Sequence, residues 1–262
     1  MKGSGALRAW GCALPLFCAL GAAATTASAA ARLELAADAG ADLRVAATNV
    51  GDAAASAVAP ALVSPHRPAA GDAVALAPGE RHEWLLPVPP PPGPGTFPVV
   101  VRVRWTDALG AHAVPVVALV STPGESPSRA RVALDAGQVG RTGHVSVHVA
   151  SPYPEALAGR VFLVLPDGLS TEPESVPAQV PPEGTVIAPF VIENHGVSPG
   201  PYPAYAVFEH SAAGVRHAAV ARTTLTVDTD GGVGWDRRML VGVTALAVAL
   251  LVVALAWRAS RG

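Results

Sequence analysis

Proline recurs along almost the whole of this chain and accounts for 26 of its 262 residues. Because proline lacks a backbone donor and clashes with the preceding helical turn, it interrupts helices wherever it recurs. Half of the residues are hydrophobic, which is too large a share for a disordered chain. The formal net charge of −2 provides no basis for nucleic-acid binding. We therefore expect a mainly β protein with no nucleic-acid partner.

The first 29 residues have the pattern of a secretory signal peptide. Lys2 and Arg8 make the start positive, and residues 9–24 are apolar and free of charge. Residues 27–29, Ala-Ser-Ala, have the small side chains that a signal peptidase requires. An uncleaved anchor is the alternative, but the alanine-rich, weakly apolar stretch favours cleavage. We expect residues 1–29 to be removed during export.

Residues 239–257 are predicted to form one transmembrane helix. They carry no charge, and at a rise of about 1.5 Å per residue they just cross a hydrocarbon core of about 30 Å. Arginine and tryptophan flank the segment, where charged and aromatic side chains meet the membrane surface. The expected membrane-interface residues are Trp235, Arg237, Arg238, Trp257 and Arg258.

A cleaved signal followed by one terminal helix determines the expected topology. Residues 30–228 would lie outside the cytoplasm, followed by a juxtamembrane stalk at 229–238, and residues 258–262 would form a cytoplasmic tail. The glycine pair at 231–232 leaves a cleaved C-terminal sorting tail open as an alternative. Membrane lipid is therefore an expected partner.

The single lysine and both cysteines fall within the predicted signal peptide. The mature chain would then have no disulfide, and all its basic side chains except histidine would be arginine. Arginine without lysine is typical of a GC-rich genome. We expect a bacterial cell-membrane protein with its ectodomain in the periplasm or outside the cell.

Alternating polarity predicts β-strands throughout the middle of the chain. In residues 99–105, Val101, Val103 and Trp105 share one face of a strand, while Arg102 and Arg104 lie on the other. Turn residues follow at 107–110, and residues 113–120 are expected to return as the partner strand, with Pro115 indicating a sheet edge or a bulge.

An internal repeat divides this region. The motif at 78–80 matches that at 183–185, and the one at 95–98 (Gly-Thr-Phe-Pro) matches that at 200–203 (Gly-Pro-Tyr-Pro), both at an offset of 105 residues. The repeat predicts one β-sandwich domain at 30–121, a linker at 122–128 and a second β-sandwich at 129–228.

Several turn-bearing segments carry a family resemblance: Thr48–Gly51, Leu76–Glu80, Gly95–Phe97 and Thr106–Gly110. Together they resemble bacterial immunoglobulin-like domains, the class of the cell-adhesion-related (CARDB) domain and of the sandwich associated with bacterial α-galactosidases. The resemblance implies two tandem antiparallel sandwiches. The second copy departs from the pattern, because Ser151 stands where Asn is expected and residues 165–169 are inserted as a stronger turn.

No catalytic or metal-binding motif stands out. The eight histidines are expected at the surface, because zinc needs three or four convergent ligands and no such cluster is predicted. The acidic run from Asp228 lacks the ligand count of a calcium loop. Nucleophile and phosphate-binding motifs are absent from the sequence. We expect no cofactor and no enzymatic activity.

A binding role therefore remains. The expected function is a non-enzymatic, membrane-anchored extracytoplasmic scaffold or protein-interaction module, with an exposed edge such as the Pro115 strand available to another protein. The alternative is a glycan- or cell-wall-binding accessory protein. Tyr153 and Tyr205 are the candidate ligand-binding residues, because they are the aromatic residues most expected to be exposed.

Overall fold

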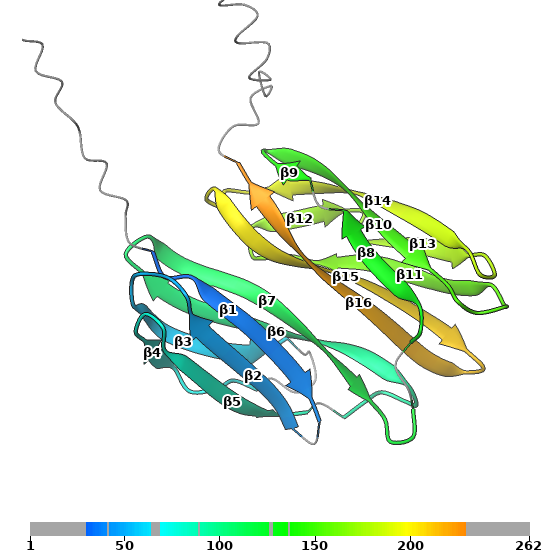
Figure 1. Cartoon of the computed structure of the whole chain (residues 1–262), viewed down its shortest axis with the longest axis horizontal. Coiled ribbons are helices and arrows are strands. Elements are labelled where there is room, and N and C mark those ends of the chain that lie inside the picture. The colour runs from blue at the N-terminus through cyan, green and yellow to red at the C-terminus, as the bar shows by residue number, and fades with distance from the viewer. Residues whose placement is uncertain are drawn as a thin grey trace, which may run out of the picture.

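The computed structural model describes residues 30–40, 42–63, 69–88, 90–125, 128–135 and 137–228. These residues form 16 strands and no helix, which confirms the mainly β expectation (Figure 1). No described segment is therefore a helix that could cross a membrane. The predicted signal peptide, stalk, transmembrane helix, tail and membrane-interface residues all lie outside the described residues.

The N-terminal half of the described chain, strands β1 to β7, forms two antiparallel sheets. One sheet has the order β1-β2-β5, made of β1 (Leu33–Ala39), β2 (Asp42–Asn49) and β5 (Arg81–Pro87). The other has the order β4-β3-β6-β7, made of β3 (Ala55–Leu62), β4 (Val74–Leu76), β6 (Thr96–Asp107) and β7 (Gly110–Ser121).

The C-terminal half, strands β8 to β16, also forms two sheets. The first has the order β12-β14-β10-β8, made of β8 (Arg131–Asp135), β10 (Thr142–Ala150), β12 (Leu169–Glu172) and β14 (Thr185–Asn194). The second has the order β13-β11-β15-β16-β9, made of β9 (Gln138–Val139), β11 (Leu157–Val164), β13 (Ser175–Val180), β15 (Gly200–Ala212) and β16 (Val215–Val227).

The strand orders of the two halves correspond. In the C-terminal half, β8-β10-β14 has the order of β1-β2-β5, and β13-β11-β15-β16 has the order of β4-β3-β6-β7. The matched sequence motifs occupy equivalent places, immediately before β5 and β14 and at the starts of β6 and β15. Two strands are added: β9, and β12, which follows the inserted turn at 166–168.

The predicted alternation of β6 is confirmed. Val101 and Val103 are fully buried and Trp105 is 7% exposed, all within the hydrophobic core of the N-terminal half. The C-terminal half has its own core, in which Val147, Phe190 and Phe208 are almost completely buried. Each half thus buries one face of each of its two sheets, which is the arrangement of a β-sandwich.

Asn49 shows why the turn after β2 in the N-terminal half differs from the turn after β10 in the C-terminal half. Its buried side chain donates hydrogen bonds to the carbonyls of Ala53 (2.7 Å) and Leu76 (3.0 Å) and accepts one from the Gly51 amide (3.0 Å). The corresponding Ser151 is also buried, but its shorter side chain accepts only the Tyr153 amide, at 3.2 Å.

Candidate functional site

The two halves contact each other over a surface that the sequence did not predict, called here the internal interface. Strands β6 and β7 of the N-terminal half lie against β15 and β16 of the C-terminal half (Figure 1). Each of these strands therefore has one face in its own core and the other toward the opposite half. The outer faces of these two sheets are consequently covered by protein.

The centre of the internal interface is apolar. Val164, Tyr205 and Val207 of the C-terminal half belong to the same buried cluster as the core of the N-terminal half. Val207 is completely buried and Tyr205 is 4% exposed. Four partly buried side chains complete the contact from both halves: Val100, Val117, Phe162 and Val220. Apolar burial of this kind stabilises a fixed arrangement of the halves.

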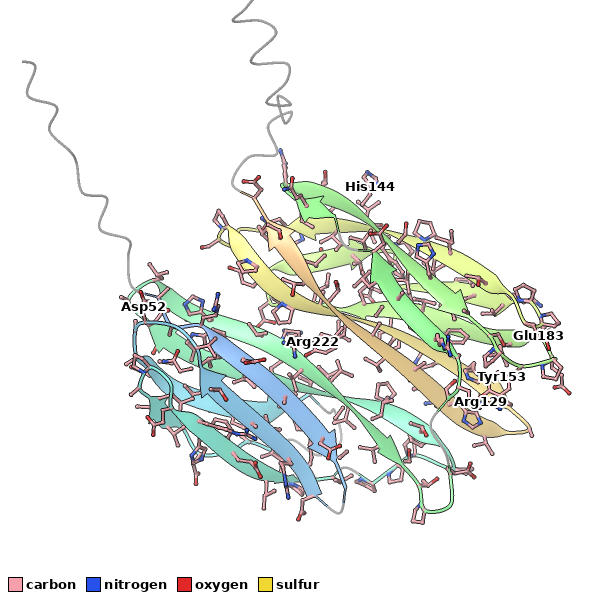
Figure 2. All side chains as sticks on the ribbon, in the orientation of Figure 1. Asp52, Arg129, His144, Tyr153, Glu183 and Arg222 are labelled. Atoms are coloured by element: carbon pink, nitrogen blue, oxygen red, sulfur yellow. The ribbon has the colours of Figure 1, made fainter. Side chains whose placement is uncertain are left out.

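Polar contacts surround this apolar centre. Arg222 donates to the carbonyl oxygen of Leu35 at 3.1 Å (Figure 2, where Arg222 is labelled). Arg102 forms an ion pair with Asp167 across the interface. These contacts fix the halves relative to each other, because each joins one residue of the N-terminal half to one residue of the C-terminal half.

A backbone contact closes one end of the internal interface. Gly95 forms a parallel bridge with Arg216, whose amide donates to the Pro94 carbonyl at 3.2 Å. A β-carbon on Gly95 would lie 1.9 Å from the Arg216 carbonyl oxygen, so only glycine allows the approach. The Arg216 guanidinium also lies 5.5 Å from the centre of the Phe97 ring. The repeated Gly-x-aromatic-Pro motif therefore makes this contact in its first copy.

Two open clefts lie along the internal interface. The first, of about 520 Å³, we call the arginine cleft; its lining includes Val63, Val100, Arg102, Arg160, Phe162 and Leu169. The second, of about 470 Å³, we call the histidine cleft; its lining includes Leu109, His112, Asp167, His195, Ser198 and Tyr202. Both are lined by residues from the two halves.

The two arginines of the arginine cleft are already paired. Arg160 donates two hydrogen bonds to the nearly buried Glu209 carboxylate, at 2.9 and 2.7 Å, and Arg102 is paired with Asp167. An anionic ligand would have to displace these carboxylates. Among the described residues, no group of three or more His, Cys, Asp or Glu side chains is placed to hold a metal ion.

Tyr205 was expected at the surface, and the structure shows otherwise. It lies at the centre of the internal interface, because β15 is covered on one face by its own core and on the other by the N-terminal half. Burial raises the pKa of its hydroxyl above the ordinary value, although the nearby Arg222 acts in the opposite direction. Tyr205 is therefore an interface residue and cannot serve as an exposed sugar platform in this arrangement.

Tyr153 is only half-buried, and it lies beside the end of β15, whereas the histidine cleft lies beside the start of that strand. Its ring meets His210 edge-on, with the ring centres 6.2 Å apart. Its hydroxyl accepts a hydrogen bond from the Arg129 amide at 3.0 Å (Figure 2). Tyr153 thus holds the beginning of β8 in place, and its ring is partly engaged by protein.

His210 corrects the expectation that all eight histidines lie at the surface. It is 3% exposed, stacks on Phe208 and on His217 with ring centres 5.2 Å apart, and contacts the Ser128 hydroxyl at 2.9 Å. Its Nδ1 has no hydrogen-bond partner among the described residues. Burial, together with repulsion from His217, lowers its pKa to about 4. The sequence signal that could have revealed it is the uncharged, largely apolar run at 204–208, which ends two residues before it in β15.

Pro115 lies in β7, the last strand of its sheet, as its position in the sequence predicted. It is nevertheless buried. Pro115 is opposite Arg102 in the β6–β7 register, so both lie on the face that meets the C-terminal half. This face of the predicted docking edge is already occupied within the molecule.

No protein-family model matches the chain, and no curated protein matches its sequence. Similar solved structures include Escherichia coli alpha-2-macroglobulin activated by porcine elastase, at 12% identity and a TM-score of 0.30, over 77% of this chain and 22% of that one. The YadV chaperone is similar at 13% identity and a TM-score of 0.33, over 73% and 99% of the two chains. Red sea bream transglutaminase is similar at 16% identity and a TM-score of 0.26, over 76% and 32%.

The chain spans about a fifth of the length of the alpha-2-macroglobulin chains that it matches.

The order of the strands in the sheets of this protein defines its fold class. Immunoglobulin-like sandwiches have the first, second and fifth strands in one sheet and the third, sixth and seventh in the other, as the N-terminal half does, with its fourth strand joined to the second sheet. The protein is an immunoglobulin-like β-sandwich protein, and its distinctive site is the internal interface.

Proposed function

We propose that residues 30–228 are two tandem immunoglobulin-like sandwiches, of the bacterial CARDB or α-galactosidase-associated type, that act as a non-enzymatic extracytoplasmic scaffold. The observation that carries this proposal is the apolar internal interface, centred on Val207 and Tyr205. A flexible tether needs no such interface, whereas a spacer that holds a partner in a defined orientation does.

The proposal includes attachment to a membrane through residues 239–257. The placement of the chain ends supports it. The Ala31 amide is bonded to Asp107 beside the β6–β7 hairpin, and Val227 is paired with Gly200. Leu109 of that hairpin and Pro199, next to Gly200, both line the histidine cleft. Both ends of the described chain therefore lie at this end of the molecule, which would face the membrane.

The partner-binding surface is proposed on the two sheets that the internal interface leaves uncovered, β1-β2-β5 and β12-β14-β10-β8. Leu85 on β5 is 62% exposed and Ile187 on β14 is 56% exposed, and these are the large apolar side chains most exposed on the described strands. Their exposure makes these two side chains the suitable probe positions on the two uncovered sheets.

Site-specific photo-crosslinking in intact cells tests this function. Because the predicted mature chain has no lysine, amine-reactive crosslinkers are unsuitable, and a photoactivatable residue is placed at Leu85 or at Ile187. The matched control has it at Leu109, which is 59% exposed at the proposed membrane end. We expect a protein adduct at 85 or 187 and none of the same mass at 109. Adducts absent from both strands would overturn the proposed surface.

Glycan binding is the second candidate, because Tyr153 remains partly exposed. It is tested by sedimenting the purified ectodomain with peptidoglycan or cell-surface polysaccharide, alongside the Tyr153→Ala variant. Saturable binding that this variant loses while its thermal unfolding is unchanged, combined with no protein adduct in cells, would replace the scaffold proposal with a glycan-binding one.

A further inference from the structure

The described chain begins with three residues that are held tightly. The Ala30 amide donates to the Asp52 carboxylate at 3.0 Å, and the Ala31 amide donates to the Asp107 carboxylate at 3.1 Å. The carbonyl of Arg32 accepts a hydrogen bond from the Val50 amide at 2.8 Å. The side chain of Ala31 is buried in the core of the N-terminal half. The backbone of residues 30–32 is therefore bonded to the N-terminal half ahead of β1.

Gly51 is required for this hold. A β-carbon at that position would lie 2.4 Å from the Ala30 carbonyl oxygen and 2.5 Å from the Arg32 nitrogen, both of them backbone atoms. Contacts this short cannot be relieved by a side-chain rotation, so any other residue would displace residues 30–32. The turn at 50–52 thus brings the Asp52 carboxylate to the Ala30 nitrogen.

A second carboxylate acts one residue further on. Burial alone would raise the pKa of Asp107, but hydrogen bonds from His112 and from the Leu109 and Ala31 amides outweigh it, so the pKa lies below its ordinary value. Asp107 is therefore ionised at neutral pH. The nitrogen of Ala30 lies next to one carboxylate and one residue away from another, an environment that favours positive charge.

An amide nitrogen cannot use that environment, because it carries no charge. Ala30 directly follows the small-residue pattern Ala27-Ser28-Ala29 that a signal peptidase requires. Hydrolysis of the Ala29–Ala30 peptide bond by water would add the hydroxyl to the Ala29 carbonyl and a proton to the Ala30 nitrogen. The new amine, protonated at neutral pH, would then be a cation 3.0 Å from the Asp52 oxygen.

We propose that Asp52 binds the α-ammonium group that Ala30 gains when the predicted signal peptide, residues 1–29, is removed. The inference rests on the exported state in the proposed function. Cleavage converts a hydrogen bond from an uncharged amide into an ion pair, so the new chain end becomes part of the folded structure. Asp52 has no other hydrogen-bond or ion-pair partner among the described residues.

The intact mass of the protein purified from its own cells tests the position of cleavage. We expect a chain that starts at Ala30. A chain that starts at any other residue overturns the inference. Photo-crosslinking from positions 85 and 187 is measured in the same cells. A chain that starts at a residue other than Ala30, together with protein adducts at these positions, would contradict this inference and leave the scaffold function supported.

Amine labelling tests the role of Asp52. Because Lys2 is the single lysine, the Ala30 amine is the one primary amine in a chain that starts there, and its labelling reports on that group alone. The ammonium form is unreactive, so pairing with Asp52 slows labelling at neutral pH. For a chain produced with Ala30 as its first residue, we expect Asp52→Asn to react about two to five times faster, which is the range for an exposed ion pair.

Asp42→Asn is the matched control, because Asp42 is an exposed aspartate of β2 at the opposite end of the strand from Asn49. Its labelling rate should equal that of the unsubstituted chain. The acceleration in Asp52→Asn should also disappear in high salt, which screens an exposed pair. Equal labelling of the Asp52→Asn and Asp42→Asn variants at low salt would show that Asp52 does not bind the terminus.

Discussion

Among individual residues, His210 shows most directly how burial changes chemistry. It lies 3% exposed between Phe208, Tyr153 and His217, and among the described residues the one hydrogen-bond partner of its ring is the Ser128 hydroxyl. A charged imidazole would be poorly solvated there and would be repelled by a charged His217. Its low pKa, about 4, keeps it neutral through the physiological range.

The stability of the protein should therefore fall as the pH is lowered from about 6.5 to 4. In that window an unfolded histidine binds a proton and the folded His210 does not, so protonation favours the unfolded chain. The full effect is about 3 kcal/mol, from the difference between the two pKa values. Chemical unfolding at pH 7.5, 5.5 and 4.5 measures it.

The His210→Phe variant should lose most of this pH dependence, whatever its stability at pH 7.5. The exposed His144 provides the control, and His144→Gln should keep the pH dependence of the unsubstituted protein (Figure 2). If the slopes of all three proteins coincide, the folded pKa of His210 is not depressed.

Among the elements, β11 lies so close to β15 and the core that a side chain at Gly159 has no space. Gly159 of β11 is paired with His210 of β15. A β-carbon on Gly159 would lie 2.2 Å from the Glu209 carbonyl oxygen and 2.7 Å from the Phe208 ring. The strand carries glycine here because a neighbouring backbone and a core ring occupy the space that a side chain would need.

Replacing Gly159 with alanine should push β11 away from β15 and lower the free energy of unfolding by about 2 kcal/mol or more. Gly40→Ala is the matched control, because a β-carbon there meets nothing within 4 Å. It should change stability by less than about 0.5 kcal/mol. Denaturant titration of the two variants compares them, and equal midpoints would contradict the close approach.

At the scale of the whole molecule, the internal interface makes the two halves one unit. Tyr205 and Val207 pack into the same cluster as Val101 and Val103. Arg222, Arg102 and the Gly95 bridge hold the margins of the contact. A carboxylate at the centre of this contact would be buried without a partner, at a cost of several kcal/mol.

The Val207→Asp variant should accordingly separate the halves while leaving each sandwich folded. Spin labels on cysteines introduced at Ala36 and Ala133, both exposed, report the distance between halves. The unsubstituted protein should give one narrow distance distribution, and Val207→Asp a broad one. Ile187→Asp, on an exposed face, should keep the narrow distribution. A narrow distribution in Val207→Asp as well would contradict a rigid apolar interface.

Much of the β-structure could be predicted because its signals are local. Alternation in β6 placed Val101, Val103 and Trp105 in the core, and glycine and aspartate marked the hairpin turns. The repeated motifs placed equivalent strands at equivalent positions in both halves. Side-chain direction along a strand and turn geometry depend on neighbouring residues, so one sequence is enough to predict them.

The candidate site was less predictable, as Tyr205 and Pro115 show. Alternation places Tyr205 on the outer face of its strand, and an outer face is normally exposed to water. The same position is buried here because the N-terminal half covers it. His210 was also missed, since its neighbours Ser128 and Tyr153 come from separate segments of the chain.

The sequence by itself determined that this protein is built from antiparallel strands in two similar sets, because alternation, proline and turn residues act through local geometry. Only the tertiary structure decided which outer faces meet water. The fit of β6 and β7 against β15 and β16 depends on the shapes of surfaces formed by distant segments, and those surfaces exist only once each sandwich has folded.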